Sequence, residues 1–164
     1  MVRTGWQRTW VRILITAMTV AVMVVIFLFS MEDAESSDQT SGQISQTVVR
    51  VVYPDYEQMR AAEQKVSFLN VQHAVRKTAH FIEYLTLGLL IRLCLESWFG
   101  GKRKRLTPEA WASGTLYACT DELHQLLIDG RSGQWMDVLL DSSGVLTGVL
   151  LSCLILSVSR KRGE

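Results

Sequence analysis

Apolar residues fall into four blocks along this chain, and polar segments separate them. Residues 13–31 contain no charged side chain, and neither do residues 142–159. As a helix, the first of these blocks would be about 28 Å long, which is enough to cross the hydrocarbon core of a bilayer. The pattern therefore predicts two membrane-spanning helices, near 11–30 and 138–158.

The other two apolar blocks carry a few charged side chains. Residues 76–98 include Glu83 and Arg92, and residues 108–128 include Asp121 and Glu122. Each block has roughly the length of a membrane span and lies between the two uncharged blocks, so both are predicted to be membrane helices that bear polar groups. The predicted fold is all-α, a single polytopic membrane domain over 1–164 with four transmembrane helices.

The polar connection 31–75 separates the first predicted span from the second. Residues 32–42 are rich in Ser, Asp and Glu and are expected to be flexible, whereas residues 48–53 suit a short strand or a membrane-surface segment. Apolar residues recur at helical spacing over 56–75. This spacing predicts an amphipathic helix that lies on the outer surface and covers the bundle before the second span.

Positive charge is concentrated on one side of the predicted membrane. Ten of the seventeen Lys and Arg residues lie before the first span, between the second and third, or after the fourth. Segment 31–74, on the other side, has seven acids and three bases. The positive-inside rule therefore predicts that both termini are cytoplasmic. The basic run 102–105 is interpreted as a topology signal that contacts anionic lipids, so no nucleic-acid partner is expected.

Ionisable side chains of the last three predicted spans meet at one depth. Lys77, His80, Glu83 and Tyr84 lie at the outer end of the second span, within an arc of about 120°. Charge in lipid is costly, so the polar groups at this depth should face one another. Their acids outnumber their bases, so a proton, a cation or a cationic ligand group should offset the excess. The remaining members of this predicted cluster are Asp121, Glu122, Gln125, Arg131, Asp137 and Asp141.

Two segments of this cluster, RKTAHFIEYLTLG (76–88) and DELHQLLIDGRSGQWMDVLLDSSG (121–144), resemble the VanZ-like family of small bacterial membrane proteins. The named member of that family is associated with resistance to the glycopeptide antibiotic teicoplanin. The resemblance implies a bacterial plasma-membrane protein of glycopeptide resistance or cell-envelope handling. Its implied partners are membrane lipids, such as a cell-wall lipid precursor, or a lipoglycopeptide. The family pattern carries over to Lys77, His80, Phe81, Glu83, Tyr84, Asp121, Glu122, Gln125, Arg131 and Asp137.

Three functions stay open for the cluster. It is an ion-pair network that only fixes helix packing, an outward-facing pocket for a lipid head group or amphiphile, or an enzyme site. In the enzyme, His80 and Glu83 or Asp121 would act as acid and base or as metal ligands. No serine or cysteine nucleophile and no HExxH-type spacing is evident, so no metal and no cofactor is expected. A transporter is less favoured, because four spans without an inverted repeat leave little for alternating access unless the protein forms an oligomer.

Smaller features predict how the helices pack. Arg92 and Glu96 stand one helical turn apart and are expected to pair. Gly144 and Gly148 share a face with Asp141 and should let the fourth span approach its neighbour closely. All three cysteines lie inside predicted spans, so small buried thiols rather than disulfides are expected.

Overall fold

Most of the residues that the computed structural model describes, which are 9–31, 34–100, 106–128 and 135–161, are helical. These residues contain no strand, so the all-α prediction is confirmed for them. The elements in chain order are α1 (Thr9–Ser30), α2 (Ala34–Val52), a short 3-10 helix η2 (Tyr56–Gln58), α3 (Ala61–Phe99), α4 (Leu106–Gln125) and α5 (Trp135–Lys161).

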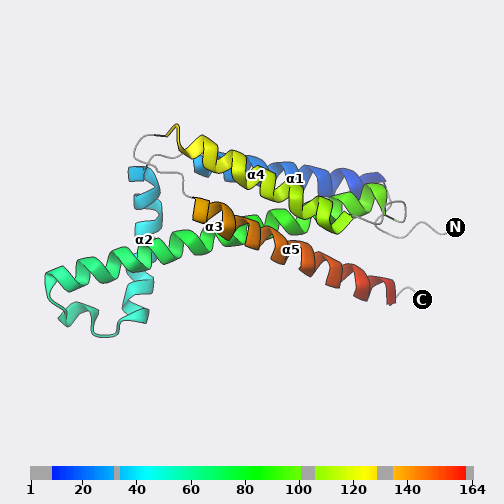
Figure 1. Cartoon of the computed structure of the whole chain (residues 1–164). Helices are drawn as coiled ribbons and strands as arrows, with labels where there is room; N and C mark the ends of the chain where they lie inside the picture. Colours follow the sequence, from blue (N-terminus) through cyan, green and yellow to red (C-terminus); the bar gives the residue numbers. More distant parts are fainter. Residues whose placement is uncertain (1–8, 32–33, 101–105, 129–134, 162–164) are drawn as a thin grey trace.

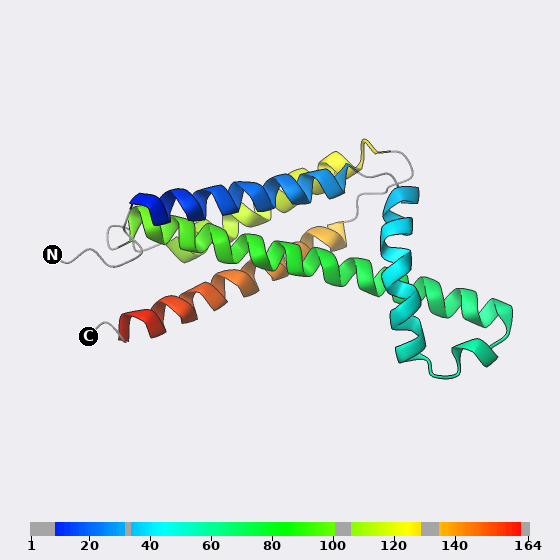
Figure 2. The same cartoon turned by 180° about the vertical axis from the view of Figure 1, so that it is seen from behind.

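The longest helix, α3, is the centre of the bundle. It packs against α1, α2, α4 and α5. Figures 1 and 2 show α1, α4 and α5 alongside the C-terminal part of α3, whereas α2 runs across α3 nearer its start. The start of α1 and the end of α5 lie at the same end of the bundle, and α2 lies toward the other end (Figure 1).

Glycines allow α3 and α5 to pack with their backbones almost in contact. A Cβ atom added at Gly144 would lie 2.7 Å from the carbonyl oxygen of Phe81 on α3. Cβ atoms at Gly88 and Gly148 would likewise collide with the backbone of the facing helix. The close approach predicted for the fourth span is therefore confirmed, and Gly88 on α3 contributes to it as well.

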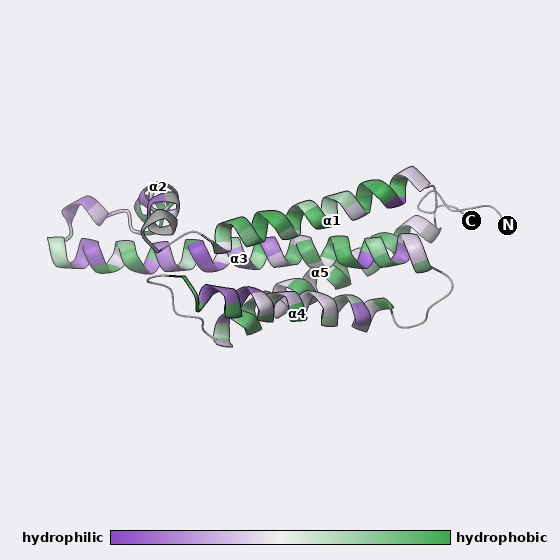
Figure 3. Cartoon of the chain, turned by 90° about the horizontal axis from the view of Figure 1, so that it is seen from above, coloured by the Kyte–Doolittle hydropathy of each residue, from purple (hydrophilic) through white to green (hydrophobic). Residues whose placement is uncertain are grey.

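Within the part of the chain that the structure describes, three helices are long and apolar enough to cross a membrane: Thr9–Ser30, Ala61–Phe99 and Trp135–Ser159. They correspond to the first, second and fourth predicted spans. Among the described helices, α4 does not meet that standard: its 20 residues are long enough, but Glu109, Asp121 and Glu122 make it too polar. Figure 3 shows the contrast: α1 is apolar along most of its length, whereas hydrophilic residues interrupt α3 and α4. The fourth span stays a prediction.

Large apolar side chains cover the outside of the bundle. Val24 on α1, Leu116 and Leu123 on α4, and Leu150 on α5 are all exposed. The interior is small by comparison and centres on buried side chains such as that of Leu87. A surface with this much exposed apolar area is typical of a protein that contacts lipid or other proteins.

The connection between the first two spans differs from the prediction. Residues 34–52 form one helix, so the expected flexibility over 32–42 is wrong from residue 34 onward, and so is the strand considered for 48–53. A helix can continue because no proline occurs before Pro54, which then stops it at Val52. Residues 32 and 33 lie outside the described residues.

The predicted surface helix over 56–75 is also not a separate element. After η2 the chain bends at Met59, and α3 then runs without interruption through 61–75 into the second predicted span. No glycine or proline occurs between 61 and 87, so nothing in the local sequence breaks the helix. Its first turn is fixed by Glu63, whose carboxylate accepts from the backbone N–H of Arg60 at 3.2 Å.

Two of the smaller predictions are confirmed. The Arg92 guanidinium pairs with the Glu96 carboxylate at 2.9 Å, with both side chains nearly buried near the end of α3. The three cysteines are free, as expected, although they are partly rather than fully buried.

Candidate functional site

The predicted polar cluster is assembled around α3, which contributes four of its members on successive turns. Tyr84 is fully buried, while Lys77, His80 and Glu83 are partly buried. Residues 77, 80 and 84 share one face because they are three and four positions apart. That face turns toward α5, since Tyr84 lies next to Gly144.

An ion pair joins α3 to the start of α5. The ammonium group of Lys77 donates to a carboxylate oxygen of Asp137, and each side chain is about one quarter exposed. Asp137 lies in the first turn of α5. The positive end of the helix dipole therefore stabilises its carboxylate, in addition to the charge of Lys77. The pair is more exposed than Tyr84 and the buried acids of the cluster.

One turn deeper on α5, Asp141 is completely buried. Neither of its carboxylate oxygens has a hydrogen-bond partner among the described residues. Among the described residues, the charges that act on it come from Glu122, Asp121 and Glu83, with Lys77 as the opposing charge. An ionised carboxylate in such surroundings is costly unless a cation approaches it.

The C-terminal end of α4 completes the described part of the cluster. Asp121, Glu122 and Gln125 are all buried there. The amide of Gln125 donates to Asp121 at 3.3 Å, one turn away. The charge of Asp121 also acts on Glu83, so these carboxylates from α4 and α3 face each other. The structure thus brings together nine of the ten predicted site residues, and Arg131 lies outside the described residues.

A group of hydroxyls beside the cluster was not predicted. The hydroxyl of Ser142, next to Asp141 on α5, lies 2.8 Å from that of Thr115 and accepts from the indole N–H of Trp111 at 3.1 Å. These hydrogen bonds join α4 to α5 beside the acids of the cluster. The sequence signal was the Ser142–Ser143 pair that follows Asp141, but its partners come from a different helix, so spacing alone did not identify them.

The described part of the cluster holds more acid than base. The charges of Glu83, Asp121 and Glu122 act on Asp141, and the one described lysine near them is already paired with Asp137. Among the described residues, no group of three or more His, Cys, Asp and Glu side chains has the geometry of a metal site. His80 and Glu83 are close enough in sequence for joint proton transfer, since they lie three positions apart on α3.

The helices and the buried acids together define a class: an all-helical membrane protein with an apolar exterior and a polar centre between α3, α4 and α5. A family model described as VanZ/LLP1 matches residues 15–156, which include both segments that carry the predicted resemblance. The chain belongs to the VanZ/LLP1 family. Searches of curated proteins and of solved structures found no match.

Proposed function

We propose that this VanZ/LLP1 family member is a four-span protein of the bacterial plasma membrane with both termini in the cytoplasm. Ten of its seventeen bases would then lie on the cytoplasmic side. The common end of α1 and α5 in Figure 1 fits an even number of crossings. Exposed Leu116 and Leu123 give α4 a lipid-compatible outer face despite its acids.

Thiol labelling tests this topology. In a background with all three native cysteines replaced by alanine, a cysteine at exposed Asp55, between α2 and η2, should react with an impermeant reagent in intact cells. A cysteine at exposed Ser159, near the end of α5, should react only after the cells are opened. The reverse pattern would contradict the orientation, and labelling of both sites in intact cells would contradict an even number of spans.

In this topology the cluster faces the outer leaflet, and its proposed role is to hold the cationic part of a lipid head group or of an amphiphile. The observation that carries the proposal is Asp141, a fully buried acid with no hydrogen-bond partner among the described residues and other acids around it. A network built only for packing would gain nothing from such a group, because a lone buried charge destabilises the fold. The part-exposed Lys77–Asp137 pair marks the side from which a ligand would enter.

The proposed consequence for the cell is altered handling of envelope lipids, and with it reduced susceptibility to the lipoglycopeptide teicoplanin. Family membership and the acidic cluster support this role, since a cationic amphiphile is the kind of molecule that buried acids near the membrane surface would attract.

Substitution of Asp141 by Asn tests the proposal. Asp141→Asn keeps the size of the side chain but removes its charge, and Asp55→Asn is the matched control at an exposed position. The fold should remain stable in Asp141→Asn, because an unpaired buried carboxylate is removed. Teicoplanin protection of a sensitive host and the lipids retained on gentle purification should both be lost. Glu83→Gln is expected to behave in the same way.

Other outcomes point to the other functions. Normal protection and normal lipid retention by folded Asp141→Asn and Glu83→Gln variants would mean that the cluster serves packing alone. If the wild type converts a retained lipid and His80→Gln or Asp121→Asn retains it unchanged, the site is an enzyme with acid-base groups. Gln125→Leu is less informative, because it also removes a hydrogen bond from buried Asp121.

A further inference from the structure

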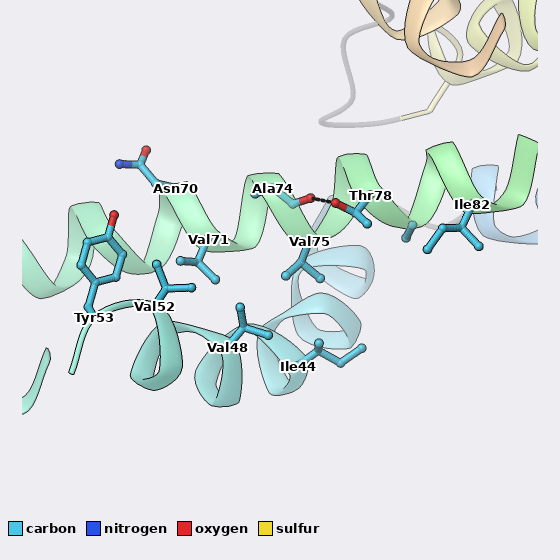
Figure 4. A pocket seen from close by; sticks show the side chains of 11 residues that line it. Ile44, Val48, Val52, Tyr53, Asn70, Val71, Ala74, Val75, Thr78 and Ile82 are labelled. Carbon is cyan, nitrogen blue, oxygen red and sulfur yellow. Dashed lines mark hydrogen bonds between the residues drawn. The ribbon is translucent and has the colours of Figure 1, made fainter. Parts of the chain in front are cut away.

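A groove of about 610 Å³ lies between α2 and α3, in a part of the molecule that the charged cluster does not use (Figure 4). Its volume is within the range of about 300–1,000 Å³ that is common for small-molecule sites. Ile44, Val48 and Val52 line it from α2, and Val71, Val75 and Ile82 are among the residues that line it from α3.

The groove is apolar along its length and polar at one end. The hydroxyl of Thr78 needs no hydrogen bond from a ligand, because it already donates to the backbone carbonyl of Ala74 at 2.8 Å. Tyr53 and Asn70 lie together at the end farthest from Ile82 (Figure 4). A ligand that fits has a long apolar part and a single polar end.

The groove is also continuous with the lipid-facing surface of α3. Ile82 belongs to the predicted span 76–98 and is 55% exposed, so it would contact the bilayer. Val75 directly precedes that span, buried Val71 lies about one turn earlier, and Ile44 and Val52 on α2 are more than half exposed. Unless something covers it, this apolar surface meets water at the membrane boundary.

The two sites lie on different sides of α3. At 100° per residue, Val71, Val75, Thr78 and Ile82 point roughly 150° away from the face that carries Lys77, His80 and Tyr84. A ligand in the groove therefore does not touch the acids of the cluster.

We infer that the groove binds an acyl chain of a membrane lipid from the leaflet next to α2. The chain rises out of the bilayer past Ile82, covers the apolar surface between α2 and α3, and places its polar end at Tyr53 and Asn70. This direction is that of an ordinary lipid in the leaflet, with the tail toward the membrane centre. The inference goes beyond the proposed function, and only the naming of this leaflet as the outer one depends on the proposed topology.

Photolabelling in lipid nanodiscs tests the inference. The probe is phosphatidylglycerol with a diazirine near the end of one acyl chain, diluted into phosphatidylcholine that surrounds the full-length protein. Labelling of α2 peptides is measured relative to α1 peptides, which report on bulk lipid. The expected result is labelling of 44–52 above the level of α1. A second probe with the diazirine next to the ester should shift the labels toward Tyr53 and Asn70.

Two pairs of variants separate the groove from the general surface. Ala74→Phe fills the groove, whereas Ala62→Phe adds the same ring to an exposed alanine of α3 outside it. Ile44→Gln makes the α2 wall polar, and Val51→Gln is its control on the same helix, at a side chain that is 76% exposed and does not line the groove. Labelling of α2 should fall to the α1 level in Ala74→Phe and Ile44→Gln and stay high in both controls.

The outcomes decide between occupants. Unchanged labelling in both groove variants would overturn the inference. It is also overturned if a cysteine at Val48 forms disulfide-linked dimers while α2 peptides stay unlabelled, since a second copy then fills the groove. Should Ala74→Phe displace α2, Ile44→Gln still decides, because its side chain is exposed and contributes little to folding. Asp141→Asn should leave labelling of the groove unchanged. Failure of the proposed function of the cluster can therefore be distinguished from failure of lipid binding in the groove.

Discussion

Replacement of Lys77 by Met should destabilise the bundle more than any other single loss of charge in the cluster. Lys77 is the one base that the structure places among the buried acids, and it pairs with Asp137 while the charges of Glu122 and Asp141 also act on it favourably. Loss of the lysine removes the charge that pairs with Asp137 and that also acts favourably on Glu122 and Asp141. Loss of Asp137 alone leaves the lysine with the other two.

The size of the effect follows from burial. Breaking a buried ion pair costs about 3–5 kcal/mol, whereas an exposed pair contributes about 0.2–1 kcal/mol. Each side chain of the Lys77–Asp137 pair is only about one quarter exposed, so Lys77→Met should lower the free energy of unfolding by about 3 kcal/mol. Asp137→Asn should cost about 1 kcal/mol, because one charge-assisted hydrogen bond is weakened while Lys77 keeps other acids nearby.

Unfolding in mixed micelles with increasing sodium dodecyl sulfate, followed by tryptophan fluorescence, measures these differences. Arg50→Met is the control, because the pair of Arg50 with Glu57 is as close as 3.0 Å but both side chains are 66% exposed. Its loss should cost less than about 1 kcal/mol. Adding Asp141→Asn to Lys77→Met should recover part of the stability. If Lys77→Met costs no more than Arg50→Met, the acids are solvated separately and the reasoning fails.

Four further predictions concern the fold. Gly88→Ala should lower stability by about 1–3 kcal/mol, because a Cβ there meets the backbone of α5. Gly42→Ala on α2 has room for a methyl group and should be neutral or stabilising in the same assay. Tyr117→Phe removes a hydroxyl that donates to α1 at 2.7 Å, and should cost about 0.6–1.7 kcal/mol in that titration. Hydrogen bonds from Arg60 lower the pKa of Glu63. The stability from this contact is therefore present above the ordinary carboxylate pKa, and it is lost as the pH falls through the lowered pKa. An NMR titration should show that the Glu63 pKa rises in Arg60→Gln.

The helical class and three helices long and apolar enough to cross a membrane could be predicted from the sequence, and so could the grouping of described acids from α3, α4 and α5. The uncharged runs at 13–31 and 142–159 leave few structures other than a membrane helix. A helix makes all of its backbone hydrogen bonds internally, so a long apolar helix is stable in lipid without help from the rest of the chain. Glu83, Asp121 and Asp141 could be grouped because charges inside a membrane must face the protein interior. These inferences use local composition and the cost of charge in lipid.

Only the tertiary structure decided which of those residues pair with one another and where α2 packs. The pairing of Lys77 with Asp137, and the isolation of Asp141, depend on how α3 and α5 cross, and glycines on both helices set that distance. The groove between α2 and α3 was also beyond the sequence. Residues 34–52 have weak local preferences, and it is packing against α3 that holds them as a helix across its side.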